Sequence, residues 1–193
     1  ATLSICARQG LDIGTGLRER IRLRRAFGGY VSPPVMREIL AGKIAPTLGG
    51  EERFSCVLFC DIRGYTRRSE RNSPAQTIAF LNTYFERVVP IVHAHGGTVI
   101  SFMGDGIMAA FGVPNELPNP CEAGFAAALE LLADRERDNA KLLSRGESPM
   151  QIGIGLHAGI GVAGHVGAST RHAYSVIGDV TNVASRLEDT SKE

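Results

Sequence analysis

The chain has 193 residues, 44% of them hydrophobic, and a formal net charge of +1. A chain of this length can bury one α/β core, and its near-neutral charge gives no overall field that would attract nucleic acid or a membrane surface. Its longest apolar runs fall far short of the roughly 20 residues that a transmembrane helix needs, and its start does not resemble a signal peptide. We therefore expect one soluble domain with an appendage, and no nucleic-acid partner.

The cysteines do not form a metal-binding or redox motif. The chain contains Cys6, Cys56, Cys60 and Cys121. No two of them form a CxxC pair, and the second and third fall inside an apolar run where small buried thiols fit well. The sequence therefore predicts reduced cysteines and a cytoplasmic location.

The N-terminal part has the character of a connector. Residues 1–16 are rich in glycine and have no regular period, as in a tether. Residues 17–27, LRERIRLRRAF, have the pattern of a short basic amphipathic helix. This helix could be a juxtamembrane or coiled-coil connector, or it could pack on its own domain.

A second N-terminal helix is indicated by Ser32 and the two prolines that follow it, and Gly42 is expected to end it. The stretch KIAPTLGGEE is typical of a linker. We therefore divide the chain into residues 1–49, a tether and helical connector to an upstream region, and residues 50–193, the main domain.

The main domain begins with a buried strand that ends in a carboxylate. Residues 53–61, RFSCVLFCD, are almost continuously apolar, which favours a central strand with Asp61 as its last residue. A short helix is expected in RGYTRRSE. Ser73 and Pro74 then begin a long helix with apolar residues at helical spacing, and Pro90 should kink it.

The remaining elements complete an alternating order. A tight turn at Gly104-Asp105-Gly106 predicts a β-hairpin with Asp105 at its tip. Asn119 begins a helix that ends near Leu143, QIGIGLHAGIGVAGHVG and HAYSVIG are predicted strands, and VTNVASRLEDTSKE is a final helix. The order βαββαββα predicts an α+β fold: a ferredoxin-like βαββαβ core with an extra strand and helix, and a sheet with antiparallel strands covered by helices.

Asp61 and Asp105 are the main candidate site residues. Either aspartate alone could be a turn residue or a helix cap. In a ferredoxin-like sheet, however, we expect both hairpin strands to flank the first strand, which would bring the two carboxylates close together. Such a pair can hold two divalent cations, Mg²⁺ or Mn²⁺, and so support phosphate chemistry.

Two other segments could bind phosphate. The backbone at Gly64, Tyr65 and Thr66, where the short helix begins, offers N–H donors, although glycine there is also ordinary in a turn. Asn182 and Arg186 are four residues apart and would project from one helix face, where arginine offers a fork of donors. Alone, such a pair is more often a solvated surface.

Four ordered blocks carry a family resemblance: FSCVLFCDIRGYT, HGGTVISFMGDGIMAAFG, IGLHAGIGVAGHVG and YSVIGDVTNVASRLE. They resemble the catalytic domains of bacterial-type class III nucleotidyl cyclases over about Arg53 to Glu193. The preceding RRAFGGYVSPPVMREIL is similar to the segment that joins such a domain to an upstream sensor. The resemblance implies an adenylyl cyclase, a phosphorus–oxygen lyase that converts ATP to 3′,5′-cyclic AMP and pyrophosphate in intracellular signal transduction.

The resemblance also implies residue roles. Asp61, Asp105 and the backbone carbonyl of Ile62 would hold two Mg²⁺ or Mn²⁺ ions per active site. Asn182 would orient the ribose, and Arg186 would stabilise charge at the α-phosphate. The two halves of each site would come from opposite protomers of a head-to-tail homodimer, so that a monomer would be inactive.

The sequence departs from the family pattern at the base pocket and at its end. Ser101 stands where adenylyl cyclases usually have Lys and guanylyl cyclases Glu, and Ser175 replaces an Asp or Thr. A guanylyl or dual-specificity cyclase using GTP is therefore an alternative. The family also continues into a C-terminal hairpin with a phosphate-binding Lys, whereas this sequence stops at SKE, so we expect it to be a fragment of a longer protein.

Two wider expectations follow. A non-catalytic nucleotide-binding or dimerisation module is a further alternative, because the sequence is truncated before that hairpin. In the full-length protein an upstream sensor or membrane domain is expected, with the cyclase domain on the cytoplasmic side of the membrane.

Overall fold

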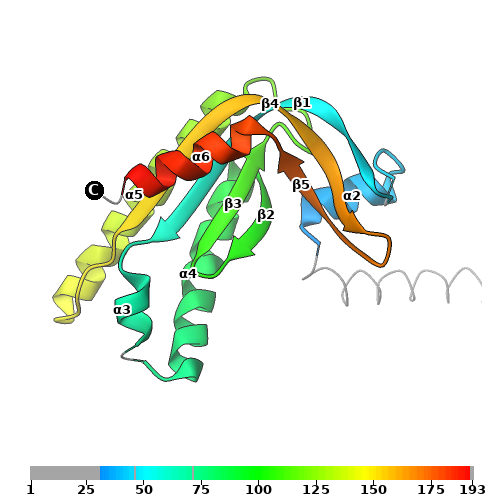
Figure 1. The fold of residues 1–193 in the computed structure, drawn as a ribbon. Coiled ribbons are helices and arrows are strands. Elements are labelled where there is room, and N and C mark those ends of the chain that lie inside the picture. The colour runs from blue at the N-terminus through cyan, green and yellow to red at the C-terminus, as the bar shows by residue number, and fades with distance from the viewer. Residues whose placement is uncertain (1–30, 46, 71, 192–193) are drawn as a thin grey trace, which may run out of the picture.

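The computed structural model describes residues 31–45, 47–70 and 72–191 (Figure 1). The predicted tether and basic helix, and Cys6, lie outside these residues. The first described helix, α2 (Pro33–Leu40), follows Ser32 at its N-cap. Gly42, with φ of 72°, follows the helix, as the sequence predicted.

The centre of the fold is one five-stranded sheet in the order β2-β3-β1-β4-β5, and every neighbouring pair is antiparallel. The strands are β1 (Gly49–Ile62), β2 (Thr98–Met103), β3 (Gly106–Phe111), β4 (Ile152–Ala168) and β5 (Arg171–Ile177). The first four have the ferredoxin-like order, and β5 is the extra strand at the edge. The predicted fold class is confirmed.

The prediction that both hairpin strands flank the first strand was wrong. Only the second hairpin strand, β3, pairs with β1, whereas β2 lies at the sheet edge beyond it. Strand β1 also continues one residue past Asp61, to Ile62. Asp61 still lies beside the hairpin tip, because Cys60 pairs with Ile107.

Helices cover both faces of the sheet (Figure 1). Helices α4 (Pro74–Ala94) and α5 (Pro120–Ser144) lie on one face, and α6 (Asp179–Thr190) lies on the other. The short α3 (Tyr65–Ser69) directly follows β1. Among the helices of the described residues, none combines the length and hydrophobicity that a membrane crossing requires.

Local sequence signals account for the helix starts. The Ser73 side chain accepts a hydrogen bond from the Gln76 backbone, and the Gln76 side chain accepts one from Ser73 in return. The Asn119 side chain likewise caps α5 by accepting from the Glu122 backbone. Pro90 lies inside α4, and the predicted kink stays a prediction.

Residues 55–60 of β1 are buried on both faces because this half of the strand lies at the centre of the sheet. Cys56, Leu58 and Cys60 pack toward α4 and α5, and the intervening Val57 and Phe59 pack toward the α6 side. Burial raises the pKa of both cysteine thiols to about 12, so they are protonated near neutral pH, as expected for buried reduced cysteines.

Helix α6 lies close to β4 because β4 presents glycines to it. Replacing Gly155 with Ala would place the new Cβ 2.1 Å from the Ala184 carbonyl oxygen and 2.3 Å from the Glu188 amide nitrogen. We expect Gly155→Ala to lower the free energy of unfolding by about 1–3 kcal/mol in urea denaturation, because α6 must shift.

Gly159→Ala is the matched control on the same strand, since its Cβ would meet the Val180 Cβ at an ordinary 3.6 Å. It should change stability little. Equal losses for Gly155→Ala and Gly159→Ala would mean that clearance for α6 is not the cause.

Candidate active site

Asp61 and Asp105 lie side by side, as predicted. Asp61 is the penultimate residue of β1, and Asp105 lies in the two-residue turn that joins β2 to β3. The Asp61 Oδ1 atom is buried and has no hydrogen-bond partner among the described residues. It packs against Gly106, where an added Cβ would be 2.9 Å away.

The two carboxyl groups interact electrostatically. Burial, followed by the negative charge of Asp61 and a hydrogen bond with it, raises the pKa of Asp105 from 3.8 to about 6. Backbone hydrogen bonds from Asp105 and Ile62 act in the opposite direction but are weaker. Two neighbouring carboxylates repel each other unless a proton or a cation lies between them. This hard oxygen donor set therefore fits Mg²⁺ or Mn²⁺.

Four other predicted site residues come directly after Asp61 in the chain: Ile62, Gly64, Tyr65 and Thr66. Ile62 ends β1 with a buried side chain, and its Cα pairs with that of Ile152 across the sheet. Gly64 precedes α3 in a left-handed conformation with φ of 66°, so the chain turns sharply there. Tyr65 and Thr66 form the first turn of α3. The structure thus groups these residues around the end of β1.

Asn182 and Arg186 form a second cluster. Both are exposed on α6, where they line a shallow surface pocket with Asp179 and Ser185. Arg186 Nη2 lies 3.8 Å from Asp179 Oδ1, and their side chains are 72% and 83% exposed. Such an exposed pair is weak, so the guanidinium is available to another ligand.

The two clusters are not joined within one chain. In the part of the chain that the structure describes, no hydrogen bond or ion pair connects Asn182 or Arg186 with Asp61 or Asp105. A single chain therefore presents two separate sets of candidate groups.

Ser101 and Ser175 are both half-buried, on β2 and β5 at opposite edges of the sheet. Their sequence neighbours Ile100 and Tyr174 nevertheless line one cavity together with residues of α2. The sheet therefore curves enough to bring the two edge strands toward each other, although no contact between the two serines is observed in the described residues.

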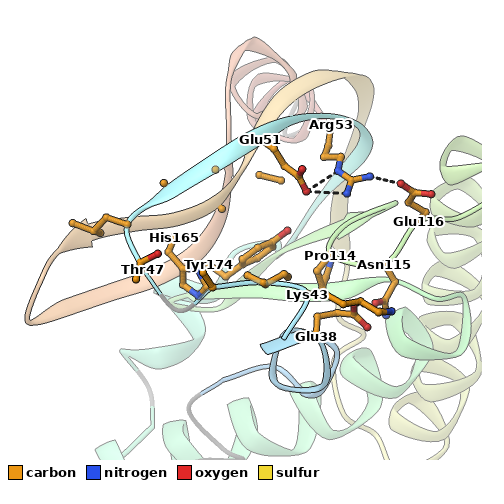
Figure 2. Close-up of a pocket in the computed structure, with 17 residues that line it drawn as sticks. Glu38, Lys43, Thr47, Glu51, Arg53, Pro114, Asn115, Glu116, His165 and Tyr174 are labelled. Carbon is orange, nitrogen blue, oxygen red and sulfur yellow. Dashed lines mark hydrogen bonds and ion pairs between the residues drawn. The ribbon is translucent and has the colours of Figure 1, made fainter. Parts of the chain in front are cut away.

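A larger cavity of about 750 Å³ is lined by the first residues of β1 (Figure 2). Asp61 lies at the other end of this strand. Its cations already have partners: Lys43 lies 3.2 Å from Glu38, and Arg53 lies 2.8 Å from Glu51 and also pairs with Glu116. The candidate site residues are not part of its wall, and the sequence did not suggest it.

The sequence also did not reveal the role of Arg63. Its guanidinium lies over Gly153 and reaches Glu188 in the last turn of α6, 2.7 Å from Oε1. The signal that could have indicated this was the repeated glycine of β4, since Gly153 and Gly155 leave space on the face toward α6.

Residues 51–193 match the family described as the adenylate and guanylate cyclase catalytic domain. The chain belongs to this family of nucleotidyl cyclases. Uncharacterized proteins of Mycobacterium bovis and Mycobacterium tuberculosis are each 41% identical to it over 179 residues, which is 92% of this chain and 31% of their own length. The chain thus spans about a third of the length of these relatives.

Solved cyclase structures have the same fold. The guanylyl cyclase Cya2 is 33% identical with a TM-score of 0.68, over 74% of this chain and 73% of that one. The adenylyl cyclase CyaB from P. aeruginosa is 30% identical with a TM-score of 0.69, over 74% of both chains.

Proposed function

We propose that this domain is the catalytic part of a homodimeric adenylyl cyclase that converts ATP to 3′,5′-cyclic AMP and pyrophosphate with two divalent cations per site. The observation that carries the proposal is the Asp61–Asp105 pair, whose unpartnered buried oxygen and raised pKa favour a cation between the two carboxylates. Family membership supplies the class of reaction.

In this proposal each residue has a distinct task. Asp61 and Asp105 hold the cations, with the Ile62 carbonyl as a further ligand. Divalent cations bound there would neutralise triphosphate charge and favour ionisation of the ribose 3′-hydroxyl. Asn182 orients the ribose for in-line attack, and Arg186 donates its fork of hydrogen bonds to the α-phosphate.

The amides at Gly64, Tyr65 and Thr66 would donate to the outer phosphate oxygens, because they follow the metal-binding residues at the end of β1.

A second copy of the chain would complete each site. Asn182 and Arg186 are exposed on α6 and have no hydrogen bond or ion pair with Asp61 or Asp105 of their own chain in the described residues. A head-to-tail dimer would place them against the aspartates of the partner subunit, and would form two equivalent sites.

The nucleotide base can be adenine or guanine, because the related structures include both a guanylyl and an adenylyl cyclase. Ser101 can donate or accept a hydrogen bond, which favours guanylyl or dual specificity as the second candidate. We expect Ser101→Lys to raise the ratio of kcat/KM for ATP over GTP by roughly tenfold. The measurement is cyclic nucleotide formation from each substrate with Mg²⁺ and with Mn²⁺; an unchanged ratio would rule out Ser101 as the base-reading residue.

Metal binding should depend on pH. In the metal-free folded protein, burial and the neighbouring Asp61 raise the pKa of Asp105 from its ordinary 3.8 to about 6, so the folded state becomes less stable as pH rises through this range. The same proton competes with the cation. Calorimetric Mn²⁺ affinity should therefore increase from about pH 5 to about pH 7 and then level off. Asp105→Asn should remove this dependence, and a pH-independent affinity in the parent protein would contradict it.

The remaining proposals concern the whole protein. We propose that residues 1–49 connect the domain to an upstream sensor or membrane region, and that the domain acts in the cytoplasm. These proposals are compatible with the greater length of the mycobacterial relatives.

A further inference from the structure

Arg63 connects the metal-binding end of β1 to the last turn of α6. Its Nη1 lies 2.7 Å from Glu188 Oε1, and its Nη2 donates to the Glu188 carbonyl oxygen at 2.8 Å and to the Ser191 hydroxyl. The side chains of Arg63 and Glu188 are only 15% and 8% exposed. Removing one member of such a buried ion pair is costly, because the other charge stays buried without a partner.

The sheet is shaped to admit this contact. Gly153 pairs directly with Asp61, and a Cβ at position 153 would lie 1.5 Å from Arg63 Nη2. The Arg63 guanidinium therefore occupies the space that a side chain at position 153 would fill, next to the strand position that pairs with Asp61. A side chain at position 153 would displace the guanidinium from its observed position between β4 and α6.

The end of β1 and the last turn of α6 differ in the contacts, besides those of Arg63, that hold them in place. The end of β1 is held by ladder pairing to β4 up to Ile62, and the Arg63 amide donates to the Gln151 carbonyl at 2.9 Å. Helix α6 has no such strand pairing. Its buried residues are Val180, Ala184 and Glu188, and of these only Glu188 lies in the last turn. The Arg63 side chain should therefore matter more for α6 than for Asp61.

We propose that Arg63 is a positioning residue that fixes α6, and with it Asn182 and Arg186, for the reaction. This inference rests on the proposed function, in which α6 of one protomer faces the aspartates of its partner. Arg63 then lies next to the metal residues of one site but acts on the other site of the dimer.

A mixed dimer of one Asp61→Asn chain and one Arg186→Ala chain, in the full-length protein, separates the two roles. Its single complete site takes α6 from the first chain and the aspartates from the second. We expect Arg63→Met on the Asp61→Asn chain to lower kcat roughly tenfold with little change in KM, because a small displacement of α6 misplaces the reacting groups. On the Arg186→Ala chain the same change should cost less than about threefold.

Two further variants keep the test decisive. Arg63→Lys retains the charge and the fold but cannot reach all three acceptors, so it should show the same asymmetry. Arg87→Met is the matched control. Arg87, on α4, forms a comparable ion pair with Asp134 on α5, at 3.0 Å. It should lower activity equally on either chain.

The outcomes distinguish the two proposals. A mixed dimer that is inactive before any change at Arg63 would overturn the shared-site function. An active mixed dimer in which the Arg63 variants have equal effects on both chains, or affect only the chain that supplies the aspartates, would overturn the positioning role of Arg63.

Discussion

Asp61→Asn should reduce cyclic nucleotide formation roughly a hundredfold to a thousandfold, because a neutral amide cannot hold a divalent cation beside Asp105. The substitution is nearly isosteric. In the metal-free protein the pKa of Asp105 is raised first by burial and second by the charge of Asp61, and the substitution removes that second contribution. The variant should therefore fold and be at least as stable as the parent. Turnover with ATP or GTP and Mn²⁺, measured beside a thermal unfolding curve, tests both expectations.

Glu52→Gln is the matched control for charge. Glu52 is an exposed carboxylate near the start of β1, whereas Asp61 is near the end of the same strand. This variant should keep full activity. If Asp61→Asn also kept full activity, the Asp61–Asp105 pair would not be the metal site, and the non-catalytic module would become the better description.

Mixing two inactive chains should restore activity. Asp61→Asn and Arg186→Ala homodimers each lack one half of both sites, whereas their purified heterodimer has one complete site of two. We therefore expect the heterodimer to recover about half of the parent turnover per dimer. Differently tagged chains, purified through both tags, give the required species.

The control is a heterodimer of Asp61→Asn with Asp105→Asn. Both changes affect the same half of the site, so each of its two sites lacks one aspartate and activity should stay low. Recovery in neither heterodimer, or an Arg186→Ala homodimer with parent activity, would contradict a site shared between protomers.

Elements defined by local signals were predictable from the sequence. The capping interactions of Ser73 and Asn119 involve residues three positions away, and the hairpin at Asp105 needs only a short turn. A nearly continuous apolar run likewise identified the second half of β1, and alternation identified β4. The sheet order was only partly predictable, because the sequence does not indicate which hairpin strand lies at an edge, and here β3 rather than β2 pairs with β1.

Candidate site residues were predictable where chemistry is visible in the residue type. Carboxylates at a strand end and a hairpin tip indicated a cation site, and the structure places Asp61 and Asp105 together. The Arg63–Glu188 pair was not predictable, since the two residues are 125 positions apart and each alone is typical of a surface. Their burial depends on Gly153, whose meaning appears only when β4 is paired with β1.

The central place of β1 has a consequence for how the chain is made. Its partner β4 begins only at Ile152, so during synthesis one edge of the largely apolar second half of β1, residues 55–62, stays unpaired while the intervening residues emerge. Open apolar strand edges promote association between nascent chains, and pairing between distant segments slows folding. A chain that stops before β4 should therefore aggregate, whereas one that includes it closes its own edge.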